Sequence, residues 1–296
     1  MKSGFIGIVG RPNVGKSTLM NSILGEKIAI TTDKPQTTRN AIRGIYTKPG
    51  EYQMVFIDTP GIHKPKNKLG SYMTDLAIST LKEVDVILFL VDSPLEDRNS
   101  GDRFILERLK ATDTPKVLVI NKIDQIDPDT FKNIYETYED MGIFEQIVGT
   151  NALEGKNVDV LVDMLSKKLQ EGPMYFPEDM VTDHPERFLV SEIIREKLLM
   201  YLEEEVPHGV AVEIENFEEG EKLTRINAAI YCEKQSHKGI IIGKEGKKLK
   251  GIGKASRLEI EALLGTKVYL ELFVKVKEKW RESTIAISNF GYKCDD

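Results

Sequence analysis

The chain of 296 residues has only two cysteines, Cys232 and Cys294, which is too few for a disulfide framework. Neither cysteine stands in a CxxC pair or in the Cys/His spacing of a structural zinc site. Long apolar runs are also missing, since the best candidate, Val84 to Val91, is far shorter than the roughly 20 residues that span a bilayer. Because Met1 is followed almost at once by a strand-like stretch, we expect no signal peptide. These absences predict two inert thiols and a cytoplasmic protein without a membrane span.

The net charge of −6 hides an uneven distribution of charge along the chain. Residues 203–221 contain eight glutamates and no lysine or arginine. Residues 234–257 contain seven lysines, one arginine and a single acid, Glu245. A phosphate backbone responds to such local clusters rather than to the charge of the whole chain. The basic segment is therefore a candidate for contact with nucleic acid.

The length suits two domains, and the first part shows a regular alternation of two patterns. Short apolar runs that predict buried strands cover residues 5–9, 54–57, 84–91, 117–120 and 143–149, and amphipathic stretches that predict helices cover 16–24, 71–83, 101–111, 130–141 and 156–170. This alternation predicts an α/β domain with a mostly parallel sheet covered on both faces. We assign this domain to residues 1–170.

A change of composition separates this part from the rest of the chain. Residues 171–185 contain three prolines and no periodic pattern, which is typical of an interdomain linker. Residues 186–296 predict an α+β domain in the order helix, strand, strand, helix-turn-helix, strand. The expected elements are a helix at 186–204, strands at 209–216 and 223–233, a glycine-rich turn at 239–246, a helix at 247–264 and a strand at 267–277.

One glycine-rich segment, residues 10–17, matches the pattern G-x-x-x-x-G-K-[ST] and lies between a predicted strand and a predicted helix. Its glycines let backbone N–H groups approach phosphates, and the start of the helix adds positive potential. Lys16 is placed to reach the β- and γ-phosphates, and the Ser17 hydroxyl is placed to bind Mg²⁺. The residues expected to bind phosphate are Gly10, Asn13, Val14, Gly15, Lys16, Ser17, Thr18 and Gly61.

Two further motifs follow the ends of predicted strands. In residues 58–61, Asp-Thr-Pro-Gly, Asp58 can hold Mg²⁺ and the Gly61 N–H can meet the γ-phosphate, although these residues alone would also suit an ordinary turn. In residues 121–124, Asn-Lys-Ile-Asp, the Asp124 carboxylate can accept hydrogen bonds from N1–H and N2–H₂ of guanine, which adenine cannot offer. Asn121 would bond the other side of the base, and the stem of Lys122 would pack on its ring. Three such motifs in this order predict a domain that binds and hydrolyses GTP.

With these motifs on one chain, the protein resembles the Era family of translation-factor-class P-loop GTPases. The fifth motif of such proteins is usually Ser-Ala-Lys or Ser-Ala-Leu, and its alanine N–H meets guanine O6. Here the stretch 150–153 reads Thr-Asn-Ala-Leu. The resemblance implies a guanine site made of Asn121, Lys122, Asp124 and Ala152. Asn151 replaces the usual serine, which leaves the hydrogen bonding of this loop open.

Residues 31–39 are polar and poorly periodic, as in many mobile surface loops. Their place in the order of motifs makes them the first switch, and the resemblance implies that one of its threonines binds Mg²⁺. We predict Thr38, with Thr37 as the alternative. The expected Mg²⁺ ligands are Ser17, Thr38 and Asp58, and the expected switch residues are Thr37, Thr38 and Arg39. The second switch is expected to begin at Gly61.

The residue that positions the attacking water is not evident. Ile62 stands where Ras-type GTPases place a glutamine, and isoleucine has no hydrogen-bonding group, so switch backbone or a bridging water must take over. His63 is a candidate base, with an exposed loop histidine as the plainer alternative. Arg11 and Arg39 suit a phosphate-facing or a solvated role equally, so neither is assigned as an arginine finger. In related GTPases an asparagine at the position of Asn13 binds K⁺, which makes K⁺ stimulation a hypothesis.

The basic segment of the second domain contains the turn Gly243-Lys244-Glu245-Gly246. A G-x-x-G turn in a KH domain clamps about four nucleotides of single strand, although a simple helix–helix turn can carry the same pattern. Residues 240–242 are expected to form an apolar floor under the bases. Trp280 either stacks on a base or packs within the domain. The expected RNA-binding residues are Lys238, Ile241, Gly243, Lys244, Glu245, Gly246, Lys247, Lys248, Lys250 and Trp280.

The resemblance covers essentially the whole chain and implies a type II KH domain over residues 186–296. It also implies that the RNA is the 3′ end region of 16S ribosomal RNA and that the role is assembly of the small ribosomal subunit. We expect a monomeric switch that uses GTP or GDP, Mg²⁺ and, as a hypothesis, K⁺. One alternative is an RNA chaperone that holds GTP as a structural or regulatory ligand. Another is a signalling GTPase in weak peripheral contact with the inner face of the cell membrane.

Overall fold

The computed structural model describes residues 1–62, 64–95 and 100–293. These residues divide into two compact units. The first unit comprises the described residues within Met1–Thr31, Thr38–Lys66 and Gly70–Asp183, and the second comprises Thr32–Thr37, Asn67–Leu69 and the described residues from His184 onward. The candidate base His63 and the second cysteine, Cys294, lie outside the described residues.

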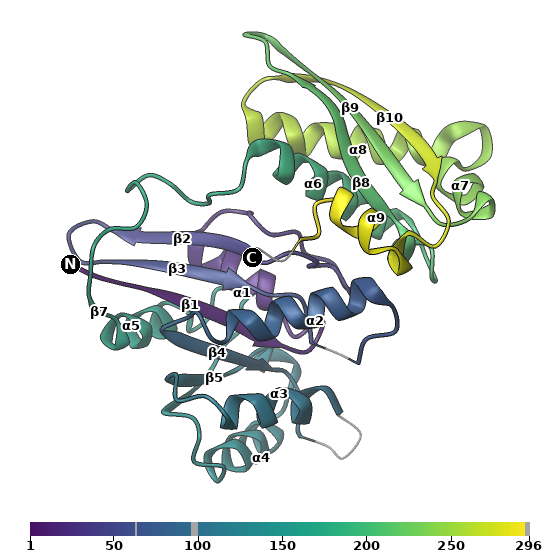
Figure 1. Ribbon diagram of the computed structural model, residues 1–296. Coiled ribbons are helices and arrows are strands. Elements are labelled where there is room, and N and C mark those ends of the chain that lie inside the picture. The colour runs from purple at the N-terminus through teal and green to yellow at the C-terminus, as the bar shows by residue number, and fades with distance from the viewer. Residues whose placement is uncertain (63, 96–99, 294–296) are drawn as a thin grey trace. The chain divides into compact units, whose positions relative to one another are not determined.

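A seven-stranded sheet forms the centre of the first unit (Figure 1). Its strands are β1 (Lys2–Gly10), β2 (Ile42–Lys48), β3 (Tyr52–Asp58), β4 (Val86–Val91), β5 (Lys116–Ile120), β6 (Gln146–Gly149) and β7 (Gln170–Glu171). The order across the sheet is β2-β3-β1-β4-β5-β6, and β7 pairs with β1. The β2–β3 and β1–β7 pairs are antiparallel, and every other pair is parallel. The carboxyl ends of β1, β3, β4 and β5 therefore meet at one edge of the sheet.

Helices cover both faces of this sheet. They are α1 (Lys16–Leu24), α2 (Lys68–Thr80), α3 (Ser100–Lys110), α4 (Pro128–Glu139) and α5 (Val158–Lys168). Helices α2, α3 and α4 share one apolar core with the sheet, whereas α1 contacts β2, β3 and α5. Every residue of β4 is buried, as a parallel strand covered on both sides must be. The predicted α/β architecture is confirmed. No helix in the described part of the chain is long and apolar enough to cross a membrane.

Two strands of the sheet, β2 and the two-residue β7, are not predicted by the apolar runs, and β2 is the longer of them. Its buried residues Ile42 and Ile45 are three positions apart, whereas a half-buried strand shows a spacing of two. The proline-containing segment that follows β7 lies along this strand, because the Ile45 N–H donates to the Val181 carbonyl at 2.8 Å. This segment is therefore packed against the first unit and is not a free tether.

The second unit has a three-stranded sheet in the order β10-β9-β8. Its elements are α6 (Glu186–Tyr201), β8 (Ala211–Glu218), β9 (Leu223–Cys232), α7 (Gln235–Ile242), α8 (Lys247–Leu264), β10 (Lys267–Val276) and α9 (Thr284–Asn289). β8 runs antiparallel to β9, and β10 runs parallel to it. The predicted order of helix, strand, strand, helix-turn-helix and strand is confirmed, and α9 is an additional element. A core of apolar residues from α6, α7, α8 and all three strands holds this unit together.

Two residues expected to contact RNA are inside this unit instead. The Ile241 side chain is fully buried in the core beside Ile252, because its position on α7 faces the sheet. Trp280 is also fully buried, and its indole Nε1–H donates to the Gly209 carbonyl at 2.9 Å. The Trp280 ring meets the Phe290 ring edge-on, with centroids 5.2 Å apart. Neither side chain has surface left for a base, so the expectation that they bind RNA is wrong and Trp280 is a packing residue.

We expect Trp280→Ala to lower the free energy of unfolding by about 3–5 kcal/mol, because it empties a large buried site and leaves the Gly209 carbonyl without its donor. Urea unfolding followed by circular dichroism measures this loss. Tyr269→Ala is the control, since the Tyr269 side chain is 47% exposed and its removal should change stability little. Equal stability of the two variants would contradict the packing role.

Candidate nucleotide and RNA sites

The segment between β1 and α1 has the backbone conformation of a tight loop. Gly15 has a φ of +99°, and a Cβ added there would lie 2.2 Å from Nδ2 of Asn121. A Cβ on Gly10 would lie 2.6 Å from the Leu90 carbonyl oxygen. Asn13 has a φ of 65°, an unusual conformation for a residue other than glycine. Close approach of Leu90 on β4 and of the Asn121 side chain after β5 therefore requires glycine at these two positions.

Lys16 is the buried cation of this loop. Its Nζ donates to the carbonyls of Arg11 at 2.8 Å and Gly10 at 3.3 Å, so the side chain curls back over the loop. Burial lowers the pKa of Lys16 to about 8. A bound polyphosphate favours the charged ammonium and raises this pKa again, so the lysine is suited to bind the β- and γ-phosphates.

Three oxygen-bearing side chains meet beside Lys16. The Ser17 hydroxyl donates to Oδ2 of Asp58 at 2.5 Å and lies 3.0 Å from the Thr38 hydroxyl. The Thr38 hydroxyl lies 3.4 Å from the same carboxylate oxygen. These are the three residues expected to bind Mg²⁺, and they come from α1, the switch segment and the end of β3.

The chemistry of this cluster fits Mg²⁺. The other oxygen of Asp58, Oδ1, is buried and has no hydrogen-bond partner within the described chain, so it is free to accept a ligand. Burial raises the pKa of Asp58 to about 6, and a cation at this place would lower it. All the available donors are hard oxygens, which Mg²⁺ prefers. Ser17 and Thr38 would bind the ion directly, and Asp58 directly or through a water.

The neighbouring switch residues have other contacts. The Thr37 hydroxyl donates to the Lys34 carbonyl at 2.7 Å, so this side chain is used within its own turn. Arg39 is almost fully buried, and Ile62 is fully buried in the core of the first unit. Of the two threonines, only Thr38 has its hydroxyl beside Ser17 and Asp58. Ile62 offers nothing to an attacking water.

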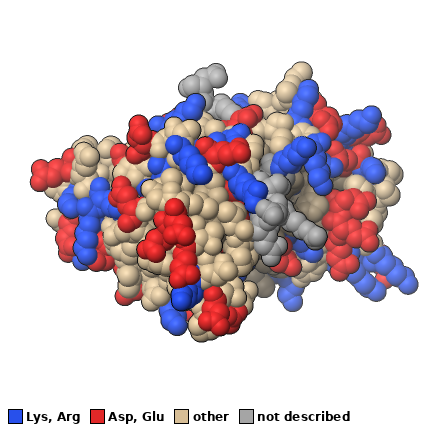
Figure 2. Space-filling view, turned by 90° about the horizontal axis from the view of Figure 1, so that it is seen from below, with Lys and Arg blue, Asp and Glu red and all other residues tan. Residues whose placement is uncertain are grey.

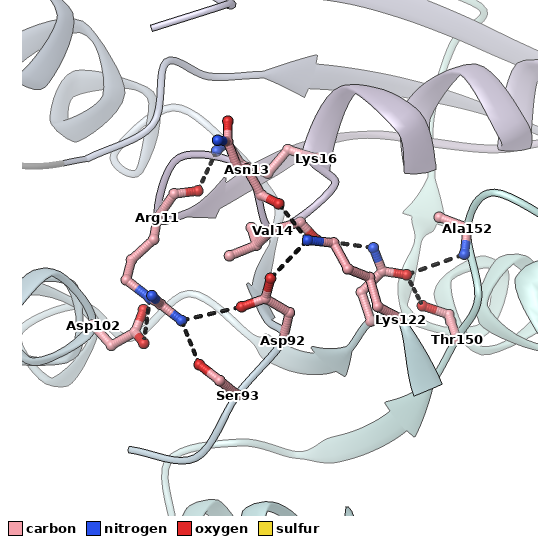
Figure 3. Close-up of polar contacts among 11 residues, drawn as sticks. Arg11, Asn13, Val14, Lys16, Asp92, Ser93, Asp102, Lys122, Thr150 and Ala152 are labelled. Carbon is pink, nitrogen blue, oxygen red and sulfur yellow. Dashed lines mark hydrogen bonds and ion pairs between the residues drawn. The ribbon is translucent and has the colours of Figure 1, made fainter. Parts of the chain in front are cut away.

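The Arg11 guanidinium is engaged by three neighbouring side chains. It pairs with Asp92 at 3.1 Å and with Asp102 at 2.7 Å, and it donates to the Ser93 hydroxyl at 2.8 Å (Figure 3). Asp102 is fully buried on α3, and that burial raises its pKa to about 6 against the influence of Arg11. With three partners around its guanidinium, Arg11 does not act as an arginine finger in this structure.

The Asn121 side chain joins the phosphate loop to the loop after β6. Its Nδ2 donates to the Val14 carbonyl at 2.9 Å (Figure 3). Its Oδ1 accepts from the Thr150 hydroxyl at 3.0 Å and from the Ala152 N–H at 3.1 Å. Asn121 was expected to bond the base and Ala152 to face guanine O6. In this structure the Ala152 N–H donates to Asn121 Oδ1, so Asn121 holds the loop that carries Ala152 in place.

The other predicted base-site residues have different surroundings, since Lys122 Nζ donates to the Asn13 carbonyl and to Asp92. Asp124 is exposed in a short 3₁₀ turn, Ile123–Gln125, and its carboxylate has no hydrogen-bond or ion-pair partner among the described residues. The open question about Asn151 is answered by its side chain, which accepts from the N–H groups of Leu153 and Glu154 at 3.1 and 3.2 Å. An asparagine thus stabilises the loop as a serine hydroxyl would.

In the second unit, the G-x-x-G turn links α7 to α8. Gly243 and Gly246 have φ values of 71° and 72°, and a Cβ on Gly243 would lie 2.7 Å from Cβ of Lys248. The side chains of Lys244 and Lys247 are exposed. On the face of the molecule drawn in Figure 2, Lys and Arg side chains are interspersed with Asp and Glu side chains, and neither sign of charge dominates.

A groove of about 480 Å³ between α8 and β10 contains Lys250, which was predicted to bind RNA, and further residues that the sequence analysis does not predict. Its lining consists of Leu249, Lys250, Gly253, Lys254, Arg257, Tyr269, Leu270 and Leu272. Lys250, Gly253, Lys254 and Arg257 are spaced as one face of a helix, which is the signal that reveals them. The positive charges of Lys250, Lys254 and Arg257 flank an apolar and aromatic floor. This combination binds single-stranded nucleic acid.

Together, the nucleotide site at a parallel sheet edge and the G-x-x-G unit define a P-loop GTPase joined to a KH domain. Family models described as "50S ribosome-binding GTPase" and "KH domain" match residues 5–122 and 205–281. GTPase Era of Alkaliphilus oremlandii is 58% identical over 293 residues, covering 98% of this chain and 99% of the relative. GTPase Era of Clostridioides difficile is 57% identical and covers 98% of each chain. The chain belongs to the Era family of GTPases.

Solved structures agree with this assignment. An Aquifex aeolicus Era variant bound to GDP·AlF₄⁻ is 43% identical, with a TM-score of 0.95 over 99% of this chain and 100% of that one. Era in complex with MgGDPNP and nucleotides 1506–1542 of 16S ribosomal RNA is similar to this chain to the same degree. The resemblance seen in the sequence motifs is thus confirmed over the whole chain.

We expect Gly15→Ala to lower affinity for GDP by about 100-fold or more, because the new methyl group collides with Asn121 and the φ is unfavourable for alanine. Isothermal titration calorimetry measures the affinity. Gly25→Ala is the matched control, since its φ is +72° but nothing lies within 4 Å of the added Cβ. If both variants bound GDP like the parent, the required contact between the two loops would be refuted.

Proposed function

We propose that the protein is a GTP-hydrolysing switch that binds the 3′ end region of 16S ribosomal RNA and assists assembly of the small ribosomal subunit. The observation that carries this proposal is the convergence of Ser17, Thr38 and Asp58 beside the phosphate loop, in a chain whose other unit presents a G-x-x-G turn and a basic groove. The complex of a family member with MgGDPNP and 16S ribosomal RNA supports the choice of RNA.

Different residues of the first unit have different roles in GTP hydrolysis. Lys16 and the loop N–H groups bind the phosphates, and Ser17, Thr38 and Asp58 hold Mg²⁺, which when bound neutralises charge on the β- and γ-phosphate oxygens. Asp124 selects guanine. Ile62 is buried and Arg11 is engaged elsewhere, so Ile62 does not replace the glutamine and Arg11 does not serve as an arginine finger. Turnover of the isolated protein is therefore slow, since a missing finger costs about 10³–10⁵-fold in rate.

Asn13 is the residue proposed to bind K⁺ in place of the missing finger. Its side chain is exposed at the rim of the phosphate loop, next to the nucleotide site. A monovalent cation there would offset charge that develops during phosphoryl transfer. Equal hydrolysis rates in K⁺ and Na⁺ buffers would count against this part of the proposal.

The RNA surface consists of the G-x-x-G turn and the groove between α8 and β10. Gly243 and Gly246 give the RNA backbone close access, and Lys238, Lys244, Lys247, Lys248 and Lys250 supply positive charge. Lys254 and Arg257 extend this charge along the groove, and Tyr269 and Leu272 provide its floor. A single strand can lie across these residues with its phosphates at the turn and its bases in the groove.

The switch segment is a natural route for the nucleotide to influence RNA binding. Thr38, a proposed Mg²⁺ ligand, follows directly after Thr32–Thr37, which belongs to the second unit. Within that unit, Arg195 of α6 donates to the Thr37 carbonyl and pairs with Glu192. Ordering of Thr38 by GTP and Mg²⁺ is thereby transmitted through the backbone to α6, and hydrolysis releases it.

We expect the double substitution Lys254→Glu and Arg257→Glu to weaken binding of a 16S 3′-end oligonucleotide by about 100-fold or more, because it reverses the charge of the groove. Fluorescence anisotropy measures this with GDP or GDPNP present. Lys132→Glu on α4, with a side chain that is 71% exposed, is the control for a charge change on the other unit. Equal loss in both would contradict the groove, and equal affinity in GDP and GDPNP would contradict nucleotide control.

The alternatives have separate tests. An RNA chaperone that only holds GTP would release no phosphate above background in the presence of RNA, whereas the switch would. We propose a cytoplasmic location, where the small ribosomal subunit is assembled. Recovery of the purified protein with floated liposomes of anionic lipid would support the peripheral membrane alternative instead.

A further inference from the structure

Asp92 has no role in the motifs of the GTPase, yet it occupies a central place in the nucleotide site. It follows directly after β4, and β4 lies between β1 and β5 in the sheet. The loop after β1 binds the phosphates and the loop after β5 recognises the base. A residue at the carboxyl end of β4 is therefore the one that topology places between the two parts of the ligand.

The carboxylate of Asp92 makes one ion pair with each part. Its Oδ1 lies 3.1 Å from Nη2 of Arg11 in the phosphate loop, and its Oδ2 lies 2.8 Å from Nζ of Lys122 in the base-recognition motif (Figure 3). Lys122 Nζ also donates to the Asn13 carbonyl at 2.6 Å, so it reaches the phosphate loop directly as well. The two cations use different oxygens of one carboxylate.

This arrangement is largely shielded from water. The side chains of Arg11, Asp92 and Lys122 are 23%, 20% and 32% exposed. Arg11 is fixed from the other side by Asp102 of α3, which is fully buried. A Cβ on Gly101 would lie 3.1 Å from Cγ of Arg11, so the stem of Arg11 lies close against α3. Charge pairs in such surroundings are more directional and less screened than pairs at the open surface.

We propose that Asp92 is a positioning residue that couples the phosphate loop to the base-recognition loop and thereby sets how long the nucleotide stays bound. Arg11 and Lys122 each influence the ligand's fit partly through this shared carboxylate. When Lys122 is packed on guanine, Asp92 holds Arg11, and with it the phosphate loop, in the bound geometry. This inference rests on guanine-nucleotide binding and is independent of the proposed RNA substrate.

The first test is the release rate of a fluorescent GDP analogue from the full-length protein. We expect Asp92→Asn to release it about tenfold faster, because the amide keeps one acceptor for two cations and turns a donor toward the other. Ser93→Ala removes only the hydroxyl contact to Arg11 and should change the rate less than about twofold. Circular dichroism checks that both variants are folded. An unchanged release rate in Asp92→Asn overturns the proposal.

The second test separates coupling from a general structural effect. Arg11→Met and Lys122→Met are combined in the parent, in Asp92→Asn and in Asp102→Asn, and the GDP dissociation constant is measured for each. In the parent, each single variant already breaks the link from Arg11 through Asp92 to Lys122. We therefore expect the affinity loss of the double variant to be about fivefold smaller than the product of the two single losses. This difference of about fivefold between the measured and the multiplied losses should persist in Asp102→Asn and vanish in Asp92→Asn.

The contrary results are distinct. Losses that multiply in the parent, or a double loss greater than the product, overturn the coupling role of Asp92. A difference that survives in Asp92→Asn overturns it as well, because the coupling then runs through other atoms. Failure of the parent protein to bind the GDP analogue would instead contradict the GTPase itself, and failure of RNA binding would leave this test untouched.

Discussion

The nucleotide site depends on one buried amide. The side chain of Asn121 donates to the phosphate loop at Val14 and accepts from Thr150 and Ala152 in the loop after β6, so it fixes three segments distant in sequence to each other. The absence of a Cβ at Gly15 is what allows this amide to come so close. Preorganisation of this kind lowers the cost of ordering the loops when nucleotide binds.

The parallel sheet explains why a small number of side-chain contacts is enough to assemble the nucleotide site. β1, β3, β4 and β5 end at one edge, and each contributes a residue there: Lys16 follows β1, Asp58 ends β3, Asp92 follows β4 and Asn121 follows β5. Pairing between the strands brings these segments to the same edge of the sheet. The residues proposed for phosphate binding, metal binding and base recognition thus lie at or after the ends of neighbouring strands of one sheet.

Much of this could be predicted from the sequence, for identifiable reasons. The motifs at residues 10–17, 58–61 and 121–124 depend on local spacing, and the alternation of apolar strands with amphipathic helices gave the α/β fold. β2 escaped because its buried isoleucines, Ile42 and Ile45, are three positions apart, and β7 escaped because two residues are too few to show a pattern. Ile241 and Trp280 were misplaced because composition does not tell which side of a helix or turn faces the core. Asp92 was overlooked although, like Asp58 and Asp124, it is an acid at or just beyond a strand's carboxyl end.

The most direct test of the account is calorimetry of Asp124→Asn with GDP and with xanthosine diphosphate. An asparagine at this exposed, unpaired position offers an amide donor where guanine has an amino group and xanthine has an oxygen. The account predicts that affinity for GDP falls by about 100-fold or more and that xanthosine diphosphate becomes the preferred ligand. Continued preference for GDP would show that the base is recognised elsewhere and would contradict the site described.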